Sequence, residues 1–251
     1  MQEIDLTKTK DVIGAYNSID FSYERKTYTD YGTQYCFNVL DGKIVAGYNI
    51  QLACFRHLRD LQRQGDEDFP YVYSIEAFNR FLKFLSLVPN VDDLSQKLEP
   101  MDWQYFIFAQ LFAWFYLDDV PRFSNIIISI ARSQGKTMIA GICLNFSYLI
   151  EIIGQSNQDF LVSSLNFDQT MKLFTYVKSM MARIIENEPF KSLADETQVQ
   201  LYSREIKSLV DANTIHTISF ESGKFDGKHF KLAVADEVGE LRTDEGISKI
   251  T

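Results

Sequence analysis

Residues 126–137 place a Gly-Lys-Thr triplet behind an apolar run, a combination that could bind the phosphates of a nucleotide. The isoleucine-rich residues 126–130 are typical of a buried parallel strand. A short polar loop follows and ends in Gly135-Lys136-Thr137, and an apolar stretch from Met138 onward predicts a helix. Strand, loop and helix in this order form the context of a P-loop, in which backbone N–H groups point at the phosphates.

The residue types of this loop suit a bound nucleoside triphosphate with Mg²⁺. Lys136 would bind the β- and γ-phosphates, and Thr137 would offer its hydroxyl to the metal ion. The residues that we expect to bind the phosphates are Arg132, Ser133, Gln134, Gly135, Lys136 and Thr137. The usual P-loop pattern has a glycine where this chain has Ile130, so an ordinary strand-to-helix turn with an exposed lysine is the alternative for this stretch alone.

A second stretch of chemical interest is residues 230–237, where an apolar run ends in Asp236-Glu237. In a Mg²⁺-dependent ATPase, one carboxylate at the end of such a strand binds the metal through water, and the next polarises the attacking water. Two carboxylates at the rim of a buried strand are costly without a cation or another partner. An acidic turn after a strand is the alternative, but the order of the two motifs favours ATP hydrolysis.

Periodicity and turn residues predict the elements that would position these motifs. The expected helices cover residues 49–63, 75–87, 102–116, 138–153 and 167–184. The expected strands cover residues 126–130, 160–164, 205–210, 214–220 and 230–235. The helix that begins at Asp102 carries Trp103 and Gln104 in its first turn, and a glutamine amide can pair with an adenine edge.

These elements predict an α/β fold of the P-loop NTPase type, with a mainly parallel central sheet of five or more strands flanked by helices. The P-loop would lie at the carboxyl ends of the strands. We expect residues 1–98 to form a helical, lid-like subdomain and residues 99–251 to form the ATPase core.

The composition is that of a globular protein: 46% of the 251 residues are hydrophobic and 24% are charged, with a net charge of -9. The acidic balance argues against general nucleic-acid binding by the whole surface, although a local basic track is compatible with it. Cys36, Cys54 and Cys143 are too few and too widely spaced for a disulfide framework. The sequence contains no signal-peptide core and no apolar stretch long enough to span a membrane.

With both motifs placed, nearly the whole chain resembles the ATPase portion of the large terminase subunit of tailed bacteriophages. Residues 131–137 are similar to the family's P-loop variant, which lacks the first glycine and contains an arginine. Residues 100–104 resemble its Pro-Trp-Gln adenine element with two residues inserted. Residues 226–237 resemble its Asp-Gly loop and Asp-Glu motif, and residues 53–61 are similar to an N-terminal helix of one branch.

The resemblance implies a role for each matching residue. Arg132 matches the P-loop arginine that senses or stabilises the γ-phosphate, and Lys136 and Thr137 keep the roles given above. Asp236 matches the Mg²⁺ carboxylate, and Glu237 matches the catalytic glutamate. Gln104 matches the glutamine that contacts adenine, next to Trp103.

The resemblance also implies partners. Members of the family act as homo-oligomeric rings, usually of five subunits, that dock on the portal protein of a procapsid in the host cytoplasm. They work with a small terminase subunit and move double-stranded viral DNA. The isolated chain could be a monomer. An arginine finger from a neighbouring subunit is expected, with Arg122 and Arg56 as candidates.

Residues 247–251 resemble the opening of the family's coupling motif, and the C-terminal nuclease domain of the family has no counterpart in this sequence. We therefore expect no cleavage of DNA by this chain. Two other functions stay open. A nucleic-acid helicase or remodelling ATPase would also use Gly-Lys-Thr and Asp-Glu motifs, and an assembly module would bind ATP but hydrolyse it poorly.

Overall fold

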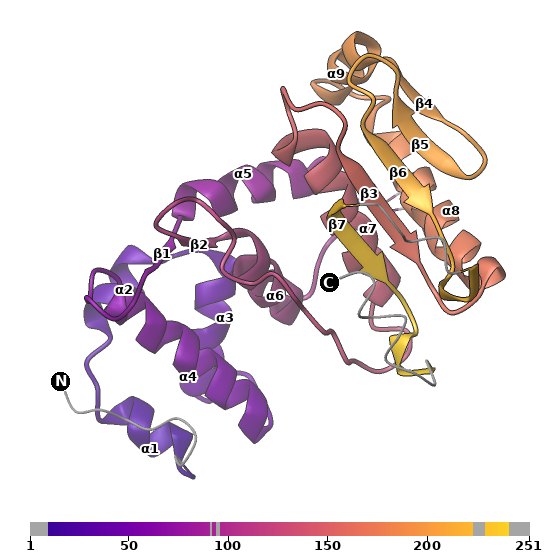
Figure 1. The fold of residues 1–251 in the computed structure, drawn as a ribbon. Helices are drawn as coiled ribbons and strands as arrows, with labels where there is room; N and C mark the ends of the chain where they lie inside the picture. The colour runs from indigo at the N-terminus through magenta and orange to yellow at the C-terminus, as the bar shows by residue number, and fades with distance from the viewer. Residues whose placement is uncertain (1–9, 91, 94–95, 223–228, 241–251) are drawn as a thin grey trace. The chain divides into compact units, whose positions relative to one another are not determined.

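The computed structural model of the chain describes residues 10–90, 92–93, 96–222 and 229–240 (Figure 1). The chain divides into two compact units, each of which is described by itself. Unit 1 comprises Met1–Leu82 and Pro100–Ile126, and unit 2 comprises Lys83–Glu99 and Ile127–Thr251. The functional division into residues 1–98 and 99–251 stays a prediction, since compactness alone does not define a functional domain.

Unit 1 is mainly helical, with one small sheet. Its elements are α1 (Val12–Asn17), α2 (Ser22–Thr27), α3 (Tyr31–Leu40), α4 (Tyr48–Arg63), β1 (Tyr71–Tyr73), most of α5 (Ile75–Leu85), α6 (Asp102–Phe112) and β2 (Trp114–Tyr116). Helix α3 packs against both α4 and α6 (Figure 1). Capping explains several starts, since Asp30 accepts the Thr33 N–H at α3 and Ser74 accepts the Ala77 N–H at α5.

The core of unit 1 surrounds His57, which is fully buried on α4. The His57 ring makes edge contacts with the rings of Tyr73, Phe106 and Trp114. Its Nδ1 accepts hydrogen bonds from Trp114 Nε1 (3.3 Å) and from the Gln110 amide (3.0 Å). Burial lowers the pKa of His57 to about 3, helped by nearby Arg56 and Arg122, so the ring is neutral and serves the core as a hydrogen-bonding group.

The prediction of one helix over residues 102–116 is wrong at its end. Helix α6 ends at Phe112, and Trp114–Tyr116 form β2, which pairs antiparallel with β1. Aromatic residues favour strands as well as buried helices, and the partner strand lies more than 40 residues earlier in the chain, where local periodicity cannot reveal it.

Unit 2 contains the larger sheet. Its elements are α7 (Lys136–Phe146), the π-helical turn η1 (Ser147–Glu151), β3 (Asp159–Ser163), α8 (Phe167–Ile184), α9 (Phe190–Thr197), β4 (Val199–Leu201), β5 (Glu205–Ser208), β6 (Thr214–Thr217), the 3₁₀ turn η2 (Phe220–Ser222), β7 (Phe230–Ala235) and the 3₁₀ turn η3 (Val238–Glu240).

The five strands of unit 2 lie in the order β4-β5-β6-β3-β7. Strand β3 is parallel to β6 and β7, whereas β5 is antiparallel to β4 and β6. The sheet is therefore mixed, and the prediction of a mainly parallel sheet is correct only for the β6-β3-β7 half. Short turns join β4 to β5 and β5 to β6, and a turn of this length can connect only antiparallel strands.

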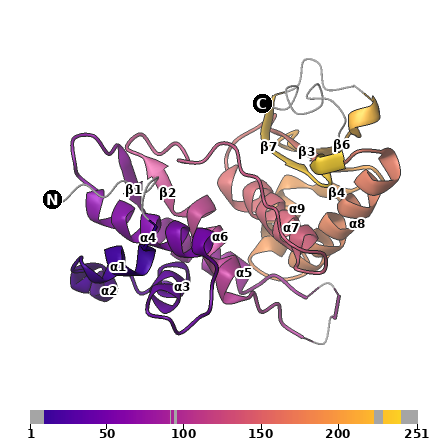
Figure 2. The same cartoon turned by 90° about the horizontal axis from the view of Figure 1, so that it is seen from below.

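Helices α7 and α8 pack against each other and cover one face of this sheet (Figure 2). The consecutive residues Phe160, Leu161 and Val162 of β3 are all fully buried, so both faces of the central strand are covered. Asn166 caps α8 by accepting the Gln169 N–H at 3.0 Å. The central strand and the helices beside it thus form the packed part of unit 2 from which the loops at the strand ends extend.

The predicted strand over residues 126–130 is wrong. These residues have no regular secondary structure, and Ile127 is 88% exposed. A strand forms only where a neighbour satisfies its backbone groups, and among the described residues the sheet ends at β7 without pairing to this segment. The apolar run identified strand-forming residues but could not supply a partner.

In the described ranges, no helix has the length and apolar character needed to cross a bilayer.

Candidate functional site

The loop that leads into α7 turns through two residues with left-handed backbone conformation. Ser133 has φ +60° and Gly135 has φ +80°, both in the left-handed region. Glycine adopts this conformation without steric cost, and here it occupies the position just before the first helical residue, Lys136. Gly135 therefore lies at a position whose left-handed backbone conformation favours glycine.

The N-terminus of α7 has no internal acceptor for its first N–H groups. Gly135 offers no side chain for capping, and the first turn contains no acidic residue. The first four N–H groups of a helix need partners from outside its own ladder, and together with the helix dipole they favour an anion. The residues at this end are also suited to an anion, because Lys136 and Thr137 are half-buried in the first turn and Arg132 is exposed in the loop.

The Asp-Glu motif lies directly after β7, as the sequence predicts. The Asp236 N–H donates to the Ser163 carbonyl at 3.0 Å, which extends the pairing of β7 with β3 by one residue. Asp236 is half-buried and Glu237 is exposed. Glu237 has φ +56°, so the chain turns sharply where the second carboxylate leaves the sheet.

The topology brings these two motifs to the same end of unit 2. Helix α7 contacts β7 and, through η1 and a loop, precedes the start of β3 (Figure 1). Helix α7 therefore runs from the phosphate-binding loop back toward the start of β3, so the N-terminus of α7 lies toward the opposite, carboxyl end of β3. Since β3 and β7 are parallel, their carboxyl ends lie at the same end of the sheet, and Asp236 and Glu237 follow the carboxyl end of β7. This is the usual location of ligands in such sheets.

The donor set at this edge fits a magnesium–triphosphate complex. Mg²⁺ is commonly bound through one or two protein oxygens together with phosphate oxygens and water, and Thr137 and Asp236 supply such oxygens. The described part of the chain contains no group of three or more His, Cys, Asp and Glu side chains arranged for metal binding.

Trp103 and Gln104 belong to unit 1, and the structure gives both a local role. Gln104 is 3% exposed, and its Oε1 accepts the Met101 N–H at 2.9 Å at the start of α6. The Trp103 indole N–H points at the Met101 sulfur at 3.3 Å. The contact of Gln104 with adenine stays a prediction, and its amide oxygen already satisfies a backbone group.

Arg122 does not have the environment of an arginine finger. Its Nη1 lies 2.8 Å from Oδ2 of Asp60, and the two side chains are 12% and 8% exposed. The guanidinium also lies over four aromatic rings, those of Phe69, Tyr71, Trp114 and Phe123. A finger must reach a neighbouring subunit, so Arg122 is better explained as a core residue. Arg56 is half-buried, with its guanidinium 5.8 Å from the Phe123 ring.

Sequence reasoning missed two serines at the carboxyl edge of β3. Ser163 and Ser164 are buried, and the Ser164 hydroxyl donates to the Asp236 carbonyl at 3.1 Å. Two hydroxyl side chains at the end of an otherwise apolar strand were the available signal, because such groups need buried partners.

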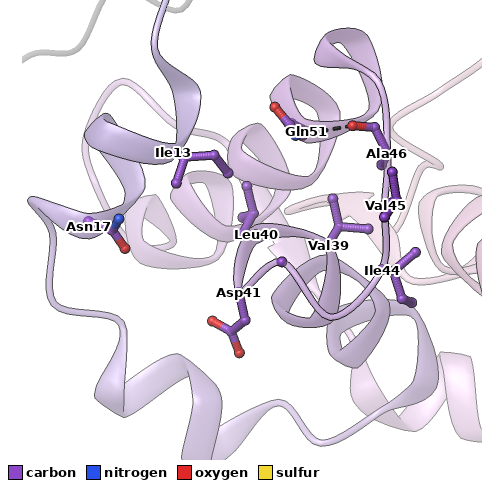
Figure 3. Close-up of a pocket in the computed structure, with 10 residues that line it drawn as sticks. Ile13, Asn17, Val39, Leu40, Asp41, Ile44, Val45, Ala46 and Gln51 are labelled. Atoms are coloured by element: carbon purple, nitrogen blue, oxygen red, sulfur yellow. Dashed lines mark hydrogen bonds between the residues drawn. The ribbon is translucent and has the colours of Figure 1, made fainter.

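A pocket of about 560 Å³ lies in unit 1 and is lined by residues from α1, α3, α4 and the segment between α3 and α4 (Figure 3). Its walls are mainly apolar, and Val45 at its rim is fully exposed. Two of its polar side chains already have partners: the Gln51 amide donates to the Ala46 carbonyl, and Asp41 forms an ion pair with Arg25. A second pocket, of about 590 Å³, lies on α8 beside Asp168, Met171, Lys172 and Thr175. Neither pocket gathers groups that would catalyse a reaction.

Comparison with known proteins identifies a family. Residues 102–251, more than half of the chain, match the family model described as terminase large subunit, ATPase domain. The crystal structure of the HK97 bacteriophage large terminase is similar in fold, with a TM-score of 0.52 and 19% sequence identity. The match covers 69% of this chain and 34% of that terminase, so this chain spans about a third of that protein's length. No curated protein matches the chain.

Proposed function

The chain belongs to the family of terminase large-subunit ATPase domains, and from that premise we propose that it hydrolyses ATP with Mg²⁺ to drive double-stranded DNA into a viral procapsid. We also propose that residues 99–251 form an ASCE-type P-loop ATPase core and that residues 1–98 form a helical, lid-like subdomain. One observation supports the proposal most: helix α7, which begins with Lys136-Thr137 directly after Gly135, packs against β7, the strand that ends at the Asp236-Glu237 motif.

The loop and the first turn of α7 would bind the triphosphate. Gly135 makes no side-chain cap hydrogen bond at this helix start, and the first N–H groups of a helix are well suited to phosphate oxygens. Lys136 would place its ammonium on the β- and γ-phosphates, and the exposed guanidinium of Arg132 would contact the γ-phosphate. The neighbouring Ser133 and Gln134 would complete the loop around the phosphates.

The end of β7 would supply the carboxylates. Thr137 and Asp236 would hold Mg²⁺, which when bound neutralises charge that develops on the transferred phosphoryl group. Glu237 would orient the attacking water and take up its proton. Because phosphoryl transfer asks for little covalent chemistry from the protein, most of the acceleration would come from positioning and charge neutralisation.

The partners follow the family. We propose that the chain assembles into a ring, most simply of five subunits, on the portal protein in the host cytoplasm, together with a small terminase subunit and double-stranded viral DNA. Trp103 and Gln104 stay proposed contacts of the adenine. A trans-acting arginine stays unassigned: the ion pair of Arg122 with Asp60 argues against that candidate, and Arg56 stays the other.

Replacement of Glu237 by Gln tests the proposed division of labour. The variant keeps the size of the side chain and removes its basicity, so turnover should fall at least about a hundredfold, consistent with the loss of a general base. ATP binding, measured by calorimetry with Mg²⁺, should stay within about threefold of the wild type. Weakened binding with unchanged turnover would contradict the role of Glu237.

A further inference from the structure

Ser164 has an unusual position for a residue that neither motif contains. It follows β3 directly and is 1% exposed. Its hydroxyl donates to the carbonyl oxygen of Asp236 at 3.1 Å, while the Asp236 N–H donates to the Ser163 carbonyl at 3.0 Å. The two serines therefore hold the backbone of Asp236 through hydrogen bonds to both its N–H and its carbonyl oxygen.

The peptide unit between Asp236 and Glu237 is held at both ends. Its carbonyl oxygen accepts the Ser164 hydroxyl, and its N–H donates to Oδ1 of Asp236 at 2.9 Å. Because a peptide unit is planar, two hydrogen bonds on its opposite sides fix its orientation. That orientation, together with the φ of Glu237, sets the direction in which the Cα–Cβ bond of Glu237 leaves the chain.

The backbone of Glu237 needs such support. Its φ of +56° places a non-glycine residue in the left-handed region, which costs about 1–2 kcal/mol relative to the usual conformation. Such a conformation persists where the surroundings over-determine it. An exposed glutamate on a turn without support would sample several directions.

Ser164 is itself firmly held. Its N–H donates to the hydroxyl of Thr170 on α8 at 3.0 Å, and Thr170 is fully buried. Its carbonyl accepts the Phe220 N–H, at the start of η2, at 3.0 Å. Ser164 thus connects α8, the segment after β6 and the end of β7, so its hydroxyl is a fixed point.

We propose that Ser164 is a positioning residue, which acts through the Asp236 carbonyl to aim the carboxylate of Glu237 at the attacking water. The inference rests on the proposed function, since it assigns Ser164 a task in that reaction. It predicts that loss of the hydroxyl affects the chemical step more than the binding of ATP, because the phosphate-binding loop does not depend on this hydrogen bond.

The test compares ATP hydrolysis by the wild type, Ser164→Ala and Ser164→Thr. In Ser164→Ala, kcat should fall about tenfold while KM for ATP changes by less than about twofold. Ser164→Thr keeps the hydroxyl and should recover at least half of the lost kcat. The melting temperature of each variant shows whether it is folded.

Tyr148→Phe is the matched control. The Tyr148 hydroxyl is also buried in unit 2 and also donates to a backbone carbonyl at 3.1 Å, that of Asn213, near the start of β6. This variant should lose a similar amount of stability and keep its kcat. Equal losses of kcat in Tyr148→Phe and Ser164→Ala, or a Ser164→Ala variant with normal kcat, would overturn the positioning role. A wild type without ATP hydrolysis would overturn the proposed function, and this inference with it.

Discussion

Replacement of Asp60 by Ala should destabilise unit 1 strongly. Asp60 is the charged partner of Arg122, with 2.8 Å between Oδ2 and Nη1. The two side chains are only 8% and 12% exposed, so water cannot replace the lost carboxylate. The variant therefore leaves a buried guanidinium without its counter-charge.

The magnitude follows from the environment of the guanidinium. Removal of one partner of a buried ion pair costs about 3–5 kcal/mol. The rings of Tyr71 and Trp114 lie 4.3 Å and 5.0 Å from the guanidinium carbon and would still stabilise the charge. Nη1 and Oδ2 are also close without the alignment of a hydrogen bond. We therefore expect a loss at the lower end, about 3 kcal/mol.

Urea denaturation followed by tryptophan fluorescence measures this loss in unit 1. The chain has two tryptophans, Trp103 and Trp114, and both belong to that unit. Trp114 is fully buried, so its emission should shift when the unit unfolds. The change in fluorescence then reports the unfolding of unit 1 in the wild type and in the variant.

Asp68→Ala is the control for Asp60→Ala. Asp68 pairs with Arg63 at 3.0 Å in the same unit, but its side chain is 78% exposed. Its removal should cost less than about 1 kcal/mol. The double variant Asp60→Leu with Arg122→Met removes both charges and should recover most of the stability. Equal effects of Asp60→Ala and Asp68→Ala would refute this account of Arg122 and restore it as a candidate finger.

Two further predictions concern the core of unit 1. Gly32→Ala should destabilise it by about 1–3 kcal/mol in urea denaturation, because the new Cβ would lie 2.5 Å from the Ala109 Cβ on α6. Gly47→Ala is the control and should have a far smaller effect, because a Cβ at Gly47 meets open space. Equal effects of the two substitutions would contradict the close packing of Gly32. His57 should make stability fall as the pH drops from about 6.5 towards 3, by up to about 1.4 kcal/mol per pH unit, since the unfolded chain binds a proton there that the folded core excludes. His57→Gln should reduce this slope, and an unchanged slope would contradict a neutral His57.

The sequence predicted the elements whose pattern is local. Helices α4 and α8 have apolar residues at helical spacing and form where expected, and β3 and β7 are apolar runs bounded by turn residues. The expected strands 205–210 and 214–220 form as the shorter β5 and β6, joined by a loop in which Ala212 has φ +59°. These features depend on neighbours in the sequence, which a single sequence contains.

Features that depend on distant partners could not be predicted. Residues 126–130 have the composition of a strand but lack a neighbour that would pair with them in the described sheet. The environment of Arg122 depends on Asp60, more than 60 residues earlier, and no local pattern marks that pair. In the same way, the bond from Ser164 to Asp236 joins residues 72 positions apart.

The candidate site was predictable in residue type but only partly in geometry. Gly135 and Lys136 lie where the P-loop pattern places them, at the start of α7. The left-handed conformations of Ser133 and Glu237 were not predictable, because non-glycine residues adopt them only when the surrounding structure imposes them. Their contributions to phosphate binding and catalysis stay proposals.

The most direct test of the central claim is steady-state ATP hydrolysis by the wild type and by Lys136→Ala over a wide range of protein concentration. We predict that the wild type hydrolyses ATP, that its specific activity rises with concentration as ring neighbours associate, and that Lys136→Ala loses the activity. Turnover that survives in Lys136→Ala would contradict the claim that the start of α7 is the site of ATP hydrolysis.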